Sequence, residues 1–337
     1  MPPALLPPPA APPRGYMSFS RAQWAALRDH TPLGLSAAEI ERLRGLDEPT
    51  TAEDVGDVLH PLSRLINLYA TAARELSQVT DRFLGRSSVA PPFVVAVAGS
   101  VAAGKSTVAR VLRAVLARWP AHPRVALVTT DGFLHPNAVL ASRGLMQRKG
   151  FPESYDVARL LRFLAEVKGG AERVDAPVYS HLTYDVLAGE AHAVERPDIL
   201  ILEGINVLQP PPADRAERGR LYVSDYVDFS IYVDAAEDDL ERWYVQRFLR
   251  LRDTAFRDPQ SYFHRYAALG EAEAVATARR IWAEINYVNL KENIEATRER
   301  ATVILRKGAG HAVEEVRLRR APLERRGVGA RMAGVEG

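Results

Sequence analysis

The sequence predicts an α/β fold: a mostly parallel, twisted sheet flanked by helices, preceded by an N-terminal helical extension. Short apolar runs recur along the chain with helical segments between or beside them, which is the pattern of a parallel sheet. The run at 93–99, "FVVAVAG", is apolar throughout, as expected for a strand buried on both faces. It leads through a glycine-containing turn into a helix, which is a local signature of a phosphate-binding strand–loop–helix unit.

The remaining elements follow in chain order. After the first strand we expect a helix at 105–118. Further strands are predicted at "RVALVTTDG" (124–132), "DILILEG" (198–204), "DFSIYVDA" (228–235) and "ATVILRK" (301–307). Helices are expected near 153–168, 237–252 and 271–297, between or beside these strands.

The segment before the first strand, 17–90, has helical patterning. Ser36 with Glu39 has the spacing of a capping box, which opens a short helix to about Leu46. Thr51 is expected to cap a longer amphipathic helix, interrupted by Pro61, whose apolar face docks on the main domain. We therefore expect a single domain over 17–320, with this helical part, 17–90, at its start.

Both ends differ in composition from the rest. Residues 1–16, "MPPALLPPPAAPPRGY", are rich in proline and are expected to be a disordered tail, with Met17 as a conceivable alternative start. Residues 321–337 lack apolar periodicity and are also expected to be disordered.

The overall composition limits the classes of function. The 337 residues are 47% apolar and carry a formal net charge of +2, which gives no reason to expect a nucleic-acid partner. The chain has no cysteine, so disulfides and thiolate metal sites are excluded, and a cytoplasmic location is expected. No apolar run approaches the roughly 18 residues of a membrane span, so no membrane partner is expected.

The turn after the first strand matches the phosphate-loop pattern G-x-x-x-x-G-K-[ST]. Glycines let backbone N–H groups approach phosphate oxygens, and the following helix directs its positive end at the same anion. Lys105 can reach the β- and γ-phosphates, and the Ser106 hydroxyl can bind Mg²⁺. The alternative is an ordinary strand–helix turn with a surface lysine. The predicted ATP-binding residues are Gly99, Ser100, Val101, Ala102, Ala103, Gly104, Lys105, Ser106 and Thr107.

Two carboxylates end predicted strands. Asp131 follows the second strand in "TTDGFLHPN", where it could accept a proton from an attacking hydroxyl, although Asp-Gly is also a common turn dipeptide. Glu203 ends "DILILEG" and resembles a Walker B carboxylate that assists Mg²⁺, or it could simply cap a turn. An [NT]-K-x-D guanine-reading motif is absent from the sequence, which argues against a GTPase.

Polar and aromatic side chains gather in three further stretches. "PVYSHLTYD" places Tyr179 and His181 on one face of an extended segment. The helix "ERWYVQRFLRLR" carries Arg247, which could stabilise charge on a transferring phosphoryl group or could lie on a solvated face. Other aromatic and amide side chains there could line an acceptor pocket or belong to the core; they are Tyr184, Tyr244, Phe248, Tyr262, Phe263, Tyr266, Asn286 and Tyr287.

Together these stretches resemble bacterial type I pantothenate kinase, a relative of phosphoribulokinase and uridine kinase. "GSVAAGKSTVARVL", "TTDGFLHPN", "RKGFPESYD", "APVYSHLTYDV", "DILILEGINVLQ", "SDYVDFSIYVDA", "SYFHRYAAL", "EINYVNLKENI" and "TRERATVIL" occur in family order over roughly 17–320. The resemblance implies ATP-dependent phosphorylation of pantothenate to 4'-phosphopantothenate, the first step toward coenzyme A, in a homodimer that coenzyme A inhibits in competition with ATP.

The resemblance also implies roles for individual residues. Asp131 is the catalytic base, Lys105 and Arg247 neutralise phosphoryl charge, and Ser106 and Glu203 hold Mg²⁺. The residues implied to bind pantothenate are Tyr179, His181, Tyr244 and Asn286, and those implied to contact the inhibitor are Arg110, Phe248, Tyr262 and Tyr266. Leu251 departs from the phenylalanine expected in the inhibitor's thiol pocket, which puts the strength of feedback in doubt.

Two other functions remain open at the sequence level. One is a different small-molecule phosphate-loop kinase, of the uridine-kinase or phosphoribulokinase kind. The other is a non-catalytic nucleotide-binding module. Testing a panel of acceptors with ATP distinguishes pantothenate kinase from another small-molecule kinase. ADP release that depends on an acceptor excludes the non-catalytic module.

Overall fold

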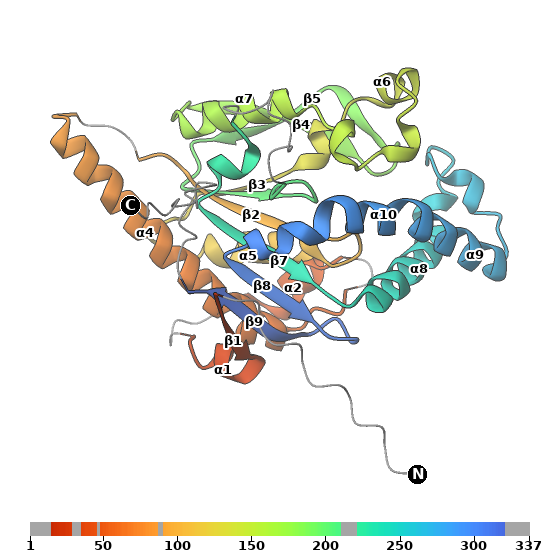
Figure 1. The fold of residues 1–337 in the computed structure, drawn as a ribbon, viewed down its shortest axis with the longest axis horizontal. Coiled ribbons are helices and arrows are strands. Elements are labelled where there is room, and N and C mark those ends of the chain that lie inside the picture. The colour runs from red at the N-terminus through yellow and green to blue at the C-terminus, as the bar shows by residue number, and fades with distance from the viewer. Residues whose placement is uncertain (1–14, 29–34, 46–47, 87–89, 210–220, 321–337) are drawn as a thin grey trace, which may run out of the picture.

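A seven-stranded sheet forms the centre of the molecule, with strand order β1-β9-β8-β7-β2-β6-β3 (Figure 1). The structure is a computed structural model that describes residues 15–28, 35–45, 48–86, 90–209 and 221–320. Strands β3, β6, β2, β7 and β8 pair in parallel, which confirms the predicted fold class. The bounds of these strands are β2 Phe93–Gly99, β3 Val125–Thr129, β6 Ile199–Glu203, β7 Phe229–Asp234 and β8 Val303–Lys307.

The register brings the carboxyl ends of the parallel strands to one edge. All seven residues of β2 are buried, so the strand lies at the centre of the core. Thr129 pairs with Glu203, and Gly99 pairs with Val233. The segments that follow β2, β3 and β6 therefore begin side by side, at the edge where parallel sheets bind their ligands.

Helices cover both faces of the sheet and its ends. The predicted helices are present, and α8 begins at Glu237 as expected. The predicted helix at 271–297 is interrupted: π-helical turns at 282–286 and 290–294 flank α10, and a 3₁₀ segment follows at 295–300. The helix bounds are α5 Lys105–Leu116, α6 Asn137–Ser142, α7 Val157–Lys168, α8 Glu237–Asp253, α9 Glu271–Ile281 and α10 Tyr287–Asn289.

Four strands lie outside the sequence prediction. β9 (Val313–Arg319) pairs antiparallel with β8, and β1 (Tyr16–Ser20) pairs antiparallel with β9. The other two, β4 (Arg173–Ser180) and β5 (Asp185–Glu195), form a separate antiparallel hairpin. Tyr16, which the sequence analysis assigns to the tail, is buried in β1, and its hydroxyl donates to the carbonyl of Ala301 at 2.6 Å. Gly15 is described as well, and the rest of the predicted tails, 1–14 and 321–337, lies outside the described residues.

The N-terminal extension packs on the domain through α1 (Arg21–Ala25), α2 (Ala37–Leu43), α3 (Ala52–Asp54) and α4 (His60–Phe83). The capping box at Ser36 and the cap at Thr51 are present as predicted. The helix expected to be interrupted by Pro61 instead continues from α3 through a π-helical turn at 55–59 into α4, and Pro61 lies just after that turn, in the first turn of α4.

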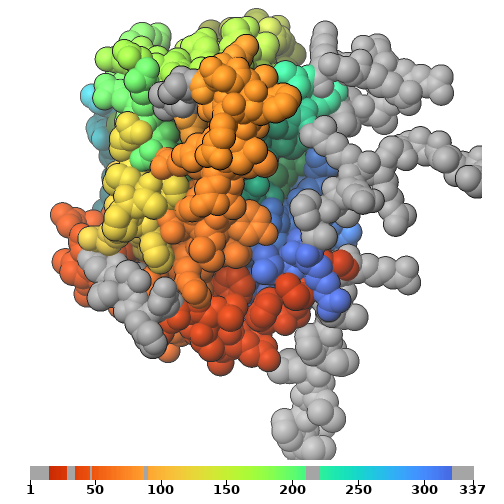
Figure 2. All heavy atoms as spheres, turned by 90° about the vertical axis from the view of Figure 1, so that its left-hand side faces the viewer, coloured from red at the N-terminus to blue at the C-terminus, as the bar shows by residue number. Residues whose placement is uncertain are grey.

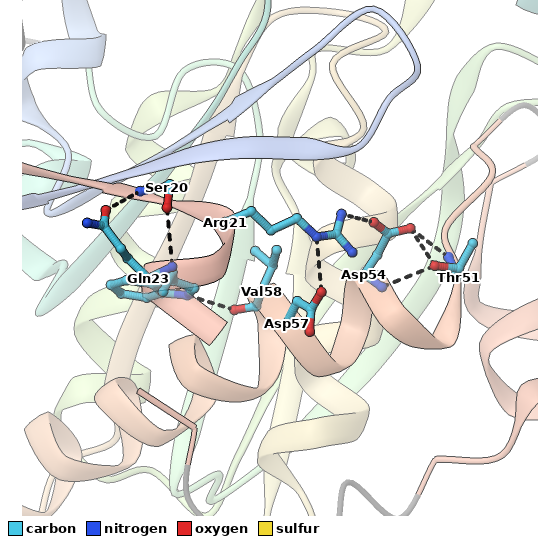
Figure 3. Close-up of polar contacts among 8 residues, drawn as sticks. Ser20, Arg21, Gln23, Thr51, Asp54, Asp57 and Val58 are labelled. Atoms are coloured by element: carbon cyan, nitrogen blue, oxygen red, sulfur yellow. Dashed lines mark hydrogen bonds and ion pairs between the residues drawn. The ribbon is translucent and has the colours of Figure 1, made fainter. Parts of the chain in front are cut away.

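Figure 3 shows how the chain before α2 is attached to this helical segment. The guanidinium of Arg21 pairs with Asp54 at 2.6 Å and with Asp57 at 3.1 Å. The indole N–H of Trp24 donates to the carbonyl of Val58 at 3.1 Å. Among the helices of the described residues, none is both long and apolar enough to cross a bilayer.

Candidate active site

The turn between β2 and α5 has the backbone geometry of a phosphate loop. Gly99 has φ +139°, and a Cβ there would lie 2.4 Å from the carbonyl oxygen of Val233, so only glycine fits against β7. Gly104 has φ +92° and precedes Lys105, the first residue of α5. The loop therefore presents its backbone and the N-terminus of α5 to the carboxyl edge of the sheet.

The polar groups of the loop are buried and only partly satisfied. The ammonium of Lys105 donates to the carbonyl of Ser100 at 2.7 Å. The hydroxyl of Ser100 is buried and has no protein partner. A buried hydroxyl without a partner is rare, and an anion in the loop would satisfy it.

The charge of Asp131 acts on both Lys105 and Glu203, and these two groups act on each other. Burial lowers the pKa of Lys105, and the negative charges of Glu203 and Asp131 oppose this. Burial also raises the pKa of Glu203 to about 7; the charge of Asp131 adds to this, while Lys105 and a hydrogen bond from Ser106 act against it. The sheet thus gathers the predicted phosphate-binding lysine, base and metal carboxylate at one place.

The residues present fit a magnesium ion. Its protein donors would be the Ser106 hydroxyl and the Glu203 carboxylate, which are hydrogen-bonded to each other. Within the described ranges, no three His, Cys, Asp or Glu side chains are grouped to hold a metal by themselves. Magnesium in kinases is usually held by one or two protein oxygens, with substrate phosphates and water completing its shell.

His181 connects this polar centre to α8. Burial lowers the pKa of His181, Asp131 opposes the shift, and the positive charges of Arg247, Arg110 and Lys149 reinforce it. Arg247 is exposed on α8. It lies near the phosphate loop as well, since its positive charge also lowers the pKa of Lys105. The structure therefore brings Arg247, His181 and Asp131 into one region.

An aromatic cluster lies beside His181. The ring centroids of Tyr179 and His181 are 5.2 Å apart, and Tyr184 lies 4.7 Å from Phe263 and 5.1 Å from Tyr262. His181 itself follows the end of β4, in the turn of the hairpin, so it does not share a strand face with Tyr179. The hairpin and the 262–266 segment together build one aromatic wall.

The helical segments α8 and 282–286 supply the remaining predicted acceptor residues. Burial raises the pKa of Tyr244 to about 12, and a hydrogen bond to the Asn286 side chain acts in the opposite direction. Phe248 packs against Tyr266 with centroids 5.4 Å apart, and Leu251 lies in the same apolar cluster. The four residues assigned to pantothenate and the aromatic residues assigned to the inhibitor thus form one continuous region.

Arg110 and Thr107 make contacts to the N-terminal extension. The Nε of Arg110 donates to the carbonyl of Leu43 at 2.7 Å, and Thr107 Oγ1 accepts from the backbone N–H of Gly45 at 2.9 Å. A Cβ on Gly104 would lie 2.6 Å from a carboxylate oxygen of Glu48 and 2.4 Å from the Lys307 ammonium. The extension therefore covers one side of the phosphate loop.

Sequence reasoning missed Lys149, which is 8% exposed and lies in the aromatic cluster. Its ammonium donates to the Oδ1 of Asn137 at 2.6 Å and to the carbonyl of Tyr184, and it lies 3.9 Å from the ring centroid of Tyr184. Burial lowers the pKa of Lys149 to about 8, while Asp185 and Asp131 oppose this. Tyr184 has φ +53°, an unusual conformation for a tyrosine that these contacts hold in place.

Comparisons with known proteins agree with this geometry. A model of the Phosphoribulokinase / Uridine kinase family matches residues 94–258. The solved D-glycerate 3-kinase of Cryptococcus neoformans aligns with a TM-score of 0.51 at 15% identity, covering 76% of this chain and 97% of that one; this similarity concerns the fold alone.

Curated relatives are much more similar. The protein "Pantothenate kinase" of Sorangium cellulosum is 60% identical over 305 residues, which span 90% of this chain and 98% of the relative. The protein of the same name from Escherichia coli is 56% identical over 305 residues, which span 90% and 96%. At this identity and coverage, the chain belongs to the pantothenate kinase family, as the sequence motifs predict.

Proposed function

We propose that this protein phosphorylates the terminal hydroxyl of pantothenate with ATP, giving 4'-phosphopantothenate and ADP, the first step of coenzyme A biosynthesis. The observation that carries the proposal is the 60% identity to a pantothenate kinase over nearly the whole chain. The site is compatible with it, because Glu203, Asp131 and Arg247 all lie close enough to Lys105 for their charges to act on its pKa.

Asp131 accepts the proton of the attacking hydroxyl. The hydroxyl oxygen forms a bond to the γ-phosphorus as the bond between that phosphorus and the β–γ bridging oxygen breaks, and ADP leaves with the bond electrons. In this proposal Lys105 and Arg247, which lie close enough for the charge of Arg247 to act on Lys105, neutralise the charge that spreads over the phosphoryl oxygens. Magnesium, bound by Ser106 and Glu203, would supply further positive charge to the phosphates.

The acceptor lies between the polar centre and the aromatic wall. Tyr179, His181, Tyr244 and Asn286 hold pantothenate in this proposal, with hydroxyl, imidazole and amide groups that suit a substrate containing hydroxyls, an amide and a carboxylate. We add Lys149, whose partly desolvated ammonium in the same cluster can attract the substrate's carboxylate.

Coenzyme A inhibits the enzyme in this proposal by competing with ATP. Arg110 contacts the inhibitor's phosphates from α5, which would require it to share its guanidinium with the carbonyl of Leu43. Phe248, Tyr262 and Tyr266 surround the thiol end, and Leu251 replaces one aromatic ring of that pocket.

The protein acts as a cytoplasmic homodimer in this proposal, and α4 is the surface we assign to the second copy. Figure 2 shows α4, in orange, running across an open face of the molecule. Its exposed residues Leu68, Ala72, Leu76, Val79 and Phe83 are spaced four, four, three and four apart, the pattern of a helix–helix seam. Phe83 is 87% and Leu76 68% exposed. Sedimentation should show a dimer that Leu76→Glu dissociates and the off-seam control Gln78→Glu does not.

A coupled assay of ADP release, with and without pantothenate, tests the activity. We expect release that depends on pantothenate, and product identified as a phosphomonoester by mass spectrometry. Turnover with uridine or ribulose 5-phosphate instead would support another small-molecule kinase. ATP binding without acceptor-dependent release would support a nucleotide-binding module.

A further inference from the structure

Two buried polar side chains join the turn that carries Asp131 to the turn that follows Glu203. The hydroxyl of Thr130 donates to the Oδ1 of Asn206 at 2.8 Å, and these residues are 0% and 4% exposed. They lie 76 positions apart, one immediately before Asp131 and the other three residues after Glu203. The bond therefore ties together the two strand ends that present the carboxylates of the site.

Gly204 allows this contact to form. A Cβ on Gly204 would lie 1.9 Å from Thr130 Oγ1, and its φ is not in the left-handed region. Glycine is required here by the close approach of the Thr130 side chain, since its backbone conformation does not demand it. The Thr130 side chain thus lies directly against the turn that follows Glu203.

The side chain of Tyr155 extends the connection to a third segment. Tyr155 is 4% exposed, and its hydroxyl lies close enough to Thr130 that the Thr130 side chain lowers the pKa of Tyr155, against the larger effect of burial, which raises it. Its segment is attached to the Asp131 turn by backbone bonds, from Asp156 N–H to the carbonyl of Phe133 at 2.7 Å and from His135 N–H to that of Ser154 at 2.8 Å. Tyr155 and these backbone bonds therefore attach a third segment to the turn that carries Asp131.

We propose that Thr130, with Asn206 and Tyr155, is a positioning residue that fixes the Asp131 carboxylate relative to the Glu203 carboxylate for phosphoryl transfer. This rests on the proposed function. In this proposal the Thr130 hydroxyl keeps the Asp131 carboxylate aligned with the acceptor hydroxyl. ATP binding does not depend on the Thr130 hydroxyl. Misplacing a reacting group by about 1 Å can cost on the order of 100-fold in rate.

The test begins with wild-type pantothenate-dependent ADP release; its absence would refute the proposed function whatever the variants do. Thr130→Val removes the hydroxyl at nearly constant volume. It should lower kcat about 10- to 100-fold, leave KM for ATP within about 2-fold, and retain a native circular-dichroism spectrum. Thr130→Ser restores the hydroxyl and should recover most of the lost kcat. A kcat for Thr130→Val equal to wild type would overturn the inference.

Two further measurements separate positioning from general destabilisation. In an Asp131→Asn background, Thr130→Val should lower kcat by less than about 3-fold, because the group it aligns is already gone; the full loss in both backgrounds would overturn the inference. Thr302→Val is the matched control, since it removes a hydroxyl that is hydrogen-bonded to Ser230 at 3.2 Å. This pair lies at the amino ends of β7 and β8, away from the carboxyl ends that carry the site, so the kcat of this variant should be unchanged. If Thr130→Val does not fold, Tyr155→Phe takes its place and should lower kcat in the same selective way.

Discussion

The buried ammonium of Lys149 makes the stability of this protein depend on pH in the alkaline range. Its pKa falls from 10.5 to about 8 because the group is buried among Tyr179, Tyr184 and Asn137. Between these two values the unfolded chain binds a proton that the folded protein has released. Folding therefore gains stability as pH rises from about 8 to 10.5, and this contribution is lost as pH falls through 8.

The size of the effect follows from the two pKa values. The fall from 10.5 to about 8 corresponds to roughly 3 kcal/mol in total, of which about 2 kcal/mol is regained between pH 7 and pH 9.5. For a domain of about 300 residues, 2 kcal/mol is about 3 °C in Tm. Lys149→Met keeps the length of the side chain and removes the titrating group.

The assay is thermal unfolding of wild type and Lys149→Met at pH 7 and pH 9.5. The Tm of wild type relative to the variant should rise by about 3 °C between the two pH values. Lys168→Met is the control for loss of a lysine, because Lys168 lies in a surface ion pair with Asp228. Parallel Tm profiles for wild type and Lys149→Met would refute the argument that burial destabilises this ammonium.

Three further outcomes are expected at the site. Lys105→Ala should abolish turnover while circular dichroism stays native, since the phosphates lose their cation; unfolding would instead make Lys105 a structural residue. Asp131→Asn should retain ATP binding by calorimetry and lower kcat about 10²- to 10⁴-fold, and an undiminished kcat would return Asp131 to a simple turn role. Leu251→Phe should tighten coenzyme A inhibition roughly two- to twelve-fold in titrations at several ATP concentrations, because a sulfur–aromatic contact contributes about 0.3–1.5 kcal/mol. No change in the inhibition constant would mean that this pocket does not place sulfur against position 251.

The parts of the site that the sequence predicts are those encoded locally. A buried apolar strand, glycines at fixed spacing and a following helix determine where Lys105 lies, because the geometry is complete within about 20 residues. Asp131 and Glu203 could be placed on one edge by a topological rule, since parallel strands end on the same side.

The parts that the sequence missed depend on contacts between distant segments. Lys149 is recognisable as a site residue only once the β4–β5 hairpin has brought Tyr184 against it. Similarly, the bond between Thr130 and Asn206 is invisible in either segment alone. β1 and β9 are not predicted because both strands are only partly buried, and β1, at the edge of the sheet, directly follows a proline-rich stretch.

The dipeptide Asp131-Gly132 allows two interpretations at the sequence level, a turn or a catalytic carboxylate, and the structure makes them compatible. Residues 130–133 form a 3₁₀ turn, so the turn exists. A Cβ on Gly132 would lie 2.2 Å from the carbonyl oxygen of Pro177 in β4, so the glycine also lets the hairpin dock directly against the turn. Because β4 carries Tyr179, the same glycine allows a close approach between Asp131, the proposed base, and Tyr179, a proposed acceptor-binding residue. A turn at 130–133 and the proposed catalytic role of Asp131 are therefore compatible within one short segment.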